Sequence, residues 1–223
     1  MSTLLLGHRG ARAVKSIPEN TFASFDRCLA DGCDGFEFDV RLTADSQPVI
    51  CHDPKFEGVT IAKSLARQLA NLPLLEEVLR RSQQHAFLDI ELKVPGLERI
   101  TADLLEQYWP QRGVVVSSFL RNVLQVFHDK ASAIPLGLIC ETKAQLRGWE
   151  HLPIAYAIVH RRLVSPDLID EVHQAGKKVF VWTVNAAPEM RRLKILGVDG
   201  IISDDTALLT RTLSNDNSAG KAK

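Results

Sequence analysis

The chain has 223 residues, 45% of them apolar and 24% charged, and its 27 acidic residues balance its 27 basic residues. This composition supplies a packed core, but it gives no overall charge that would attract nucleic acid or an anionic membrane. The apolar run Leu4–Leu6 is too short for a signal peptide and no stretch approaches the ~18–20 apolar residues of a membrane span, so we expect a soluble, cytoplasmic protein without stable membrane insertion.

Short apolar runs alternate with longer amphipathic segments along almost the whole chain. Strands are predicted at residues 3–7, 35–40, 48–51, 86–92, 114–118, 135–140, 154–159, 178–184 and 199–203. Helical patterns lie between most of them. Examples are residues 18–32, which open with a proline and close with a glycine, and residues 165–176, where Ser165 is the expected N-cap. This alternation is typical of βα units and a parallel sheet.

The connection between the second and third predicted strands is too short for a parallel crossover. Residues 41–47 separate them, whereas a crossover needs about a dozen residues or more, so the run at 48–51 should be an antiparallel arm. Eight strands remain, which is the number in a closed (β/α)8 TIM barrel. The alternative is an open doubly wound sheet, but the glycine-rich first turn that is usual there is missing.

The sequence predicts one (β/α)8 domain over residues 1–213, with a short insertion at about 41–72 after the second strand. Residues 214–223 are small and polar, which indicates a disordered tail. No internal repeat or linker to a second domain is visible. The four cysteines form no CxxC pair and are expected to be reduced rather than joined in disulfides.

Polar side chains gather where the first two predicted strands end, which is the functional end of a TIM barrel. His8 and Arg9 follow the first strand directly. On the second strand, Glu37 and Asp39 are two residues apart and share one face, while the phenylalanines beside them face the other way. We expect the aromatic face to pack under helices and both carboxylates to face the barrel mouth.

The strand at 86–92 repeats this pattern, with Asp89, Glu91 and Lys93 on one face. Inward charges are costly unless they are paired or bind a metal. Carboxylates that converge without cysteine suit a hard cation, Mg²⁺ or Ca²⁺ with Mn²⁺ also suitable, rather than zinc. The alternative is a structural network of ion pairs among the carboxylates and the nearby cations Arg9 and Lys93.

A second histidine, His52, follows the antiparallel arm. If the arm folds back over the barrel mouth, it brings His52 opposite His8. Two histidines beside a cation and two basic side chains would form a centre for phosphoryl transfer, with one base and one acid. A hydroxyl of the substrate itself, next to the phosphate, would then be the nearest nucleophile, which predicts a cyclic phosphate intermediate.

The stretches GHRGA, PENT, FEFDVRLTADSQPVICHD, LDIELK, SSF, WTVN and GVDGIISDD together resemble the glycerophosphodiester phosphodiesterases, a family of the phospholipase C-like phosphodiesterase superfamily. The resemblance runs from about residue 4 to residue 210 and is most specific in the first fifty residues. It implies a TIM barrel that hydrolyses glycerophosphodiesters to glycerol 3-phosphate and an alcohol with the help of a divalent cation. The implied partner is thus a small-molecule substrate, and the oligomeric state stays open.

Roles follow from the resemblance position by position. It implies that His8 and His52 are the acid/base pair and that Arg9 and Lys93 bind the phosphate. It assigns the metal to Glu37, Asp39 and Glu91, and the lining of the substrate cleft to Phe119, Trp182 and Asn185.

The sequence departs from the family after His52, where many relatives carry a longer insertion that caps the site. Here only residues 54–72 remain, which leaves the identity of the leaving alcohol open. Two alternatives are kept beside hydrolysis of glycerophosphodiesters. One is a lysophospholipase D-like or cyclising phosphodiesterase, and the other is a non-catalytic sensor of phosphate ligands.

Overall fold

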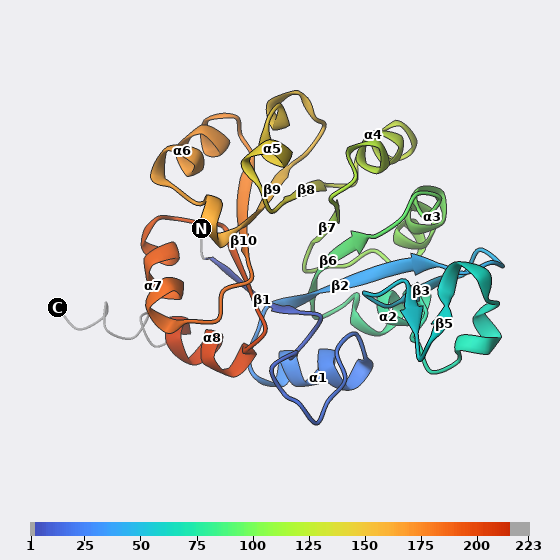
Figure 1. The fold of residues 1–223 in the computed structure, drawn as a ribbon. Coiled ribbons are helices and arrows are strands. Elements are labelled where there is room, and N and C mark those ends of the chain that lie inside the picture. Colours follow the sequence, from blue (N-terminus) through green and yellow to red (C-terminus); the bar gives the residue numbers. More distant parts are fainter. Residues whose placement is uncertain (1–2, 215–223) are drawn as a thin grey trace.

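The structure, a computed structural model, describes residues 3–214 and contains a closed barrel of eight parallel strands (Figure 1). The barrel closes because β1 pairs with β11 on one side and with β2 on the other. In sheet order the strands are β1 (Leu4–His8), β11 (Gly200–Ser203), β10 (Lys178–Trp182), β9 (Tyr156–His160), β8 (Leu136–Cys140), β7 (Val114–Ser118), β6 (Phe87–Leu92) and β2 (Gly35–Leu42). The predicted TIM barrel is confirmed, and the open-sheet alternative is wrong.

Helices surround the barrel on the outside (Figure 1). They are α1 (Phe22–Ala30), α2 (Leu75–Ser82), α3 (Glu98–Gln107), α4 (Arg121–Lys130), α5 (Lys143–Leu146), α6 (Pro166–Gln174), α7 (Ala187–Ile195) and α8 (Thr206–Ser214). Short 3-10 turns lie at Ile61–Lys63, Ala66–Leu69, Trp149–His151 and Arg161–Leu163. Each barrel strand is therefore followed by a helix, as the alternating pattern predicts.

Helix starts follow the capping residues. Ser165 accepts a hydrogen bond from the backbone N–H of Leu168 at 3.2 Å and caps α6, as predicted. The expected start of α1 at Pro18 is wrong by four residues. Thr21 is the N-cap, because its side-chain oxygen accepts from the backbone N–H of Ser24 at the start of the helix. The side chain of a proline has no oxygen that could do this.

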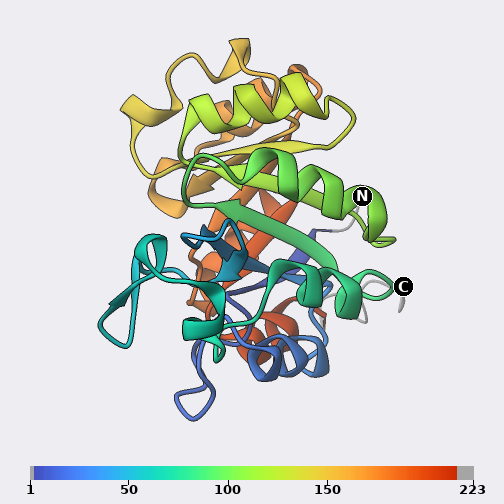
Figure 2. The ribbon, with the colours of Figure 1, turned by 90° about the vertical axis from the view of Figure 1, so that its right-hand side faces the viewer.

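The segment after β2 turns back as predicted. Strand β3 (Pro48–Ile50) pairs antiparallel with β2, and Val40 lies opposite Ile50. Beyond it, β4 (Lys55–Phe56) and β5 (Val59–Thr60) form a small hairpin that the sequence patterns did not reveal. Val49, Cys51, Ile61 and Leu69 pack into a separate apolar cluster under this insertion. Figure 2 shows the insertion projecting from one end of the barrel.

The core has two parts, because side chains alternate across each strand. One part lies between the strands and the helices, where the rings of Phe25 and Phe36 stack with centroids 4.2 Å apart. The other fills the barrel interior with residues that include Phe87, Tyr156 and Phe180. The aromatic face of β2 thus lies outward under α1, as predicted.

The last helix extends into the predicted tail. Ser214 is the last residue of α8, so the predicted tail begins inside a helix. Residues 215–223 of that tail lie outside the described residues. Within residues 3–214, no helix combines the length and apolar character needed to cross a bilayer.

Candidate active site

A cavity of about 240 Å³ opens at the carboxyl ends of the barrel strands. Eight of the ten predicted site residues line it: His8, Arg9, Glu37, His52, Glu91, Lys93, Phe119 and Trp182. The remaining lining residues are Asp89, Ile139, Glu141, Ile158 and Ile202. Asp39 lies just behind this lining, within the carboxylate cluster described below, and Asn185 lies elsewhere.

The turn after β1 holds Arg9 in a left-handed backbone conformation, with φ of 54°. Such a conformation is strained for a residue other than glycine and needs support from its surroundings. That support comes from hydrogen bonds: the backbone N–H of Arg9 donates to Glu37 at 2.9 Å, and its carbonyl accepts from Ser24 Oγ at 2.9 Å. Gly10 follows at φ of 79°, where a Cβ atom would lie 2.6 Å from the backbone of Ser24. The sequence His-Arg-Gly is thus the turn that joins strand β1 to the site.

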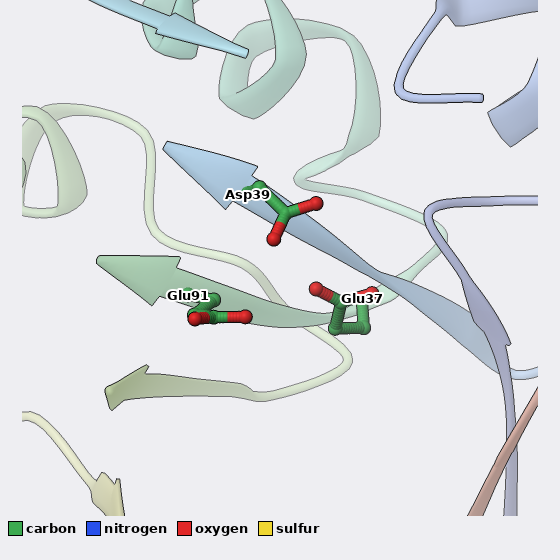
Figure 3. A group of neighbouring side chains, drawn as sticks. All are labelled: Glu37, Asp39 and Glu91. Atoms are coloured by element: carbon green, nitrogen blue, oxygen red, sulfur yellow. The ribbon is translucent and has the colours of Figure 1, made fainter. Parts of the chain in front are cut away.

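Three carboxylates meet on one side of the cavity (Figure 3). Glu37 and Asp39 come from β2 and Glu91 comes from the neighbouring β6, and one oxygen of each lies within 4.8 Å of the others. All three side chains are buried. Alternation along two paired strands therefore produces a convergent set of oxygen donors, which hard divalent cations prefer.

Ion pairs run through the same cluster. Lys93 Nζ lies 2.7 Å from Glu91 Oε1 and 3.3 Å from Asp39 Oδ1, and Arg9 Nε lies 3.2 Å from Asp39 Oδ2. The predicted network of ion pairs is therefore present for Asp39 and Glu91, whereas Glu37 forms no ion pair with Arg9 or Lys93 within residues 3–214. It does not balance the charge, because Asp89 adds a fourth buried carboxyl group and Arg9 also pairs with a carboxylate outside the cluster. An excess of buried negative charge fits a divalent cation.

The pKa values of the carboxyl groups reflect this crowding. Burial, together with the charges of Asp39 and Glu91, raises the pKa of Glu37 well above its ordinary value. Burial and the charge of Asp39 raise the pKa of Glu91 to about 7. Burial also acts on Asp39, but the charges of Lys93 and Arg9 outweigh it and lower the pKa of that group. For Glu37 and Glu91, burial and the neighbouring carboxylates thus outweigh the charges of Arg9 and Lys93.

We expect the metal-free protein to lose stability as the pH rises from about 4.5 to about 7. Glu91 and Asp89, whose pKa values are raised to about 7, keep protons in the folded state that the unfolded chain has already released. Raising the pH therefore favours the unfolded chain and lowers the free energy of unfolding. His52, whose pKa is lowered by burial, opposes this trend as a single group. Urea unfolding at several pH values measures the slope. A free energy of unfolding that rises between these pH values would contradict the raised pKa values of Glu91 and Asp89. Saturating Mg²⁺ should make the free energy of unfolding depend less on pH.

Each of the two histidines is held by a carboxylate. His8 Nδ1 lies 2.7 Å from Asp204 Oδ1, and His52 Nδ1 lies 2.8 Å from Asp53 Oδ1. A carboxylate at Nδ1 fixes the proton on that nitrogen and leaves Nε2 to exchange a proton with a ligand. Burial opposes ionisation of Asp204, but its hydrogen bond and charge interaction with His8 lower its pKa strongly. Both imidazoles are therefore oriented for proton transfer.

Asn185 does not line the cavity, contrary to the expectation from the sequence. Its Nδ2 donates to Asp204 Oδ2 at 2.6 Å, and its Oδ1 accepts from the backbone N–H of Asp204 at 2.9 Å. The amide thus holds the carboxylate that holds His8, and its Oδ1 also accepts from Ser203 Oγ at 3.0 Å. Asn185 is therefore placed behind the histidine rather than in the cavity wall.

The sequence patterns missed two supporting residues besides Glu141, which lines the cavity. Asp204 follows β11, and its position at the carboxyl end of a barrel strand is a signal that could have identified it. Asn20 donates from Nδ2 to Asp39 Oδ2 at 2.8 Å. It lies in the PENT stretch, but no spacing rule connects that loop to the second strand.

A larger hollow of about 980 Å³ lies at the opposite end of the barrel, around Thr3, Lys178 and Asp199. Asp199 Oδ2 there is 2.8 Å from His173 Nε2. Within residues 3–214, the carboxylates at the other end are the one group whose geometry could hold a metal ion. The amino-terminal end of a TIM barrel serves stability rather than catalysis, so the smaller cavity is the candidate site.

Comparisons with known proteins agree with this location. The profile of the "Glycerophosphoryl diester phosphodiesterase family" matches residues 8–208. A glycerophosphodiester phosphodiesterase of Caldanaerobacter subterraneus is 30% identical over 239 residues, which cover 94% of this chain and 97% of the relative. Among solved structures, an Oleispira antarctica phosphodiesterase in complex with the product sn-glycerol-3-phosphate has a TM-score of 0.83 at 25% identity, covering 96% of this chain and 97% of that one. A glycerophosphodiester phosphodiesterase of Parabacteroides distasonis shares the fold, with a TM-score of 0.85 at 24% identity and 99% of each chain covered.

The profile covers most of the barrel, including both histidines and all three clustered carboxylates. The relatives match nearly their whole length, so the similarity is not confined to one motif. The resemblance seen in the sequence is confirmed: this chain belongs to the glycerophosphoryl diester phosphodiesterase family.

Proposed function

We propose that this protein hydrolyses glycerophosphodiesters to glycerol 3-phosphate and an alcohol, with a divalent cation and a pair of histidines. The observation that carries the proposal is the shared cavity, in which His8, His52 and the carboxylate cluster meet. The product bound to the Oleispira antarctica relative supports the same substrate class. A site of this kind suits phosphoryl transfer because it combines proton transfer with charge stabilisation.

Glu37, Asp39 and Glu91 would hold the cation, which supplies Lewis-acid stabilisation of charge on the phosphate when bound. Oxygen-only donors favour Mg²⁺, Ca²⁺ or Mn²⁺. Arg9 and Lys93 lie beside the cluster and bind the phosphate oxygens in this account. Their existing contacts with Asp39 keep both side chains extended toward the cavity.

His8 and His52 exchange protons with the substrate through Nε2. One histidine takes the proton of the glycerol hydroxyl next to the phosphate, and the other protonates the departing alcohol. The hydroxyl oxygen forms a bond to phosphorus as the bond from phosphorus to the alcohol breaks, which gives a cyclic glycerol phosphate. Water then opens the ring while the two histidines exchange roles.

Removing the neighbouring hydroxyl from the substrate should slow turnover by roughly 100-fold, because intramolecular attack has a high effective molarity that free water lacks. The test compares glycerophosphocholine with its 2-deoxy analogue at equal concentrations. Competition by the deoxy compound against the parent substrate checks that it still binds. Equal rates for the two compounds would rule out the cyclic route and leave direct attack by water.

A product assay separates the proposed activity from the alternatives. Purified protein with Mg²⁺ is incubated with glycerophosphocholine or with lysophosphatidylcholine, and the phosphorus-containing products are identified by ³¹P NMR. We expect glycerol 3-phosphate from the first substrate. Faster cleavage of the acylated substrate would favour a lysophospholipase D-like activity, a stable cyclic product would favour a cyclising enzyme, and binding without turnover would favour a sensor.

A further inference from the structure

The cavity has two chemically different halves. The polar half is built from the ends of β1, β2 and β6 and from the segment after β3. It holds the two histidines, the carboxylates and the basic side chains of Arg9 and Lys93. The other half is built from the ends of β7 to β10, with β11 closing it. Its lining is mainly apolar: Phe119, Ile139, Ile158, Trp182 and Ile202. We call this second half the apolar wall.

Aromatic rings form the upper part of the apolar wall. The rings of Phe119 and Trp182 meet edge to face, with centroids 5.7 Å apart. The ring of His160 also packs against Trp182, with centroids 5.3 Å apart. The indole Nε1–H donates to the backbone carbonyl of Ile158 at 3.2 Å, which fixes the orientation of the ring. The wall therefore presents a rigid aromatic surface at the barrel mouth.

One carboxylate lies on this wall. Glu141 directly follows β8 and lines the cavity, and its side chain is exposed. Its backbone N–H donates to Gln145 Oε1, but its carboxylate has no hydrogen bond or ion pair within residues 3–214. The nearby Arg161 pairs with Glu189 at 3.1 Å, and neither Arg161 nor Arg162 lines the cavity. The charge of Glu141 also acts on His160. Because Glu141 forms no ion pair with an arginine or lysine within residues 3–214, its carboxylate can meet a cation on the ligand.

We infer that the apolar wall and Glu141 together form the subsite for the leaving alcohol and select an alcohol that carries a positive charge, with a quaternary ammonium preferred. This inference rests on the proposed function and concerns the alcohol that the sequence leaves open. A quaternary ammonium is both apolar and cationic, so it gains from aromatic rings and from a carboxylate at the same time. In the proposed reaction the polar half holds the phosphate and the divalent cation, so the alcohol has to lie against the apolar wall. Lys93 Nζ already lies over the Phe119 ring at 5.9 Å, so Trp182 is the ring that is left for the ammonium group.

The chemistry of the wall also argues against other alcohols. An anionic alcohol would be repelled by Glu141. A neutral polar alcohol would lose hydrogen bonds to water against the isoleucines and aromatic rings without gaining new ones. Selection therefore acts through charge and through aromatic contact, and the two contributions can be separated by changing Glu141 alone.

The test compares two substrates that differ only in charge: glycerophosphocholine and its neutral isostere, in which 3,3-dimethylbutanol replaces choline. We expect the wild-type protein to have the higher kcat/KM for the cationic substrate. Glu141→Gln should lower kcat/KM for glycerophosphocholine about fivefold and leave the value for the neutral isostere unchanged. Glu150→Gln is the matched control, because Glu150 is also exposed but lies outside the cavity, and it should change neither value.

The outcomes distinguish this inference from the proposed function. If the wild-type protein cleaves both substrates and Glu141→Gln changes both values equally or changes neither, the charge selection is wrong while the hydrolysis stands. If the wild-type protein cleaves neither substrate, the proposed function fails and the inference fails with it. Because Glu141 is exposed, the variant should fold, and circular dichroism checks that it does.

Discussion

Glu37→Gln is expected to lower kcat/KM about 10³-fold without destabilising the metal-free protein. Glutamine keeps the size of the side chain and an oxygen that can accept from the backbone N–H of Arg9. It removes a charge that burial and the neighbouring carboxylates disfavour, as the raised pKa of Glu37 indicates. The free energy of unfolding in the absence of metal should therefore stay the same or increase, while the affinity for the cation falls.

This combination of effects separates a metal site from a structural ion-pair network. If the carboxylates served only a structural network, neutralising Glu37 would remove its charge interaction with Arg9 and destabilise the fold. Glu98→Gln is the matched control, since Glu98 is also buried and accepts from a backbone N–H, that of Gly96, but lies outside the cavity. Activity and urea unfolding of both variants are measured with and without Mg²⁺. A Glu37→Gln variant with nearly normal turnover would contradict the carboxylate assignment.

Replacing either His8 or His52 by alanine should lower kcat about 10³-fold, because each step of the proposed reaction needs one acid and one base. The cation should still bind, since neither histidine belongs to the carboxylate cluster. His173→Ala serves as the control, because His173 is a partly exposed histidine at the other end of the barrel that also pairs with an aspartate. Rate measurements with saturating Mg²⁺ give kcat for all three variants.

The histidine prediction has a specific contrary result. If one of the two variants keeps more than about a tenth of the wild-type rate, that histidine is not a required proton donor or acceptor. A loss of cation affinity in either variant would show instead that the histidine supports the metal site.

The part of the site that the sequence predicts is the part that strand geometry controls. Alternation along β2 places Glu37 and Asp39 on one face, and the same phase on β6 adds Glu91 to it. The short connection after β2 forces an antiparallel arm, which brings His52 over the barrel mouth. These inferences need only the period of a strand and the direction of its neighbours.

The part that could not be predicted depends on contacts between distant loops. His8 and Asp204 are 196 positions apart, and only closure of the barrel brings them to 2.7 Å. The resemblance assigns Asn185 to the lining of the cleft, but its side chain turns to Asp204 instead. Glu141 also follows a strand, and no spacing pattern distinguishes it from an ordinary surface glutamate. Side-chain directions in loops are set by local hydrogen bonds that sequence periodicity does not encode.

The most direct test of this account is the return of activity to metal-depleted protein. The chain is dialysed against chelator, freed of chelator, and assayed on glycerophosphocholine after Mg²⁺, Ca²⁺, Mn²⁺ or Zn²⁺ is added singly. The account predicts negligible release of glycerol 3-phosphate without metal and recovery with at least one of the three hard cations. Full activity in the dialysed protein, or full recovery with Zn²⁺ alone, would contradict a hard-cation site formed by Glu37, Asp39 and Glu91.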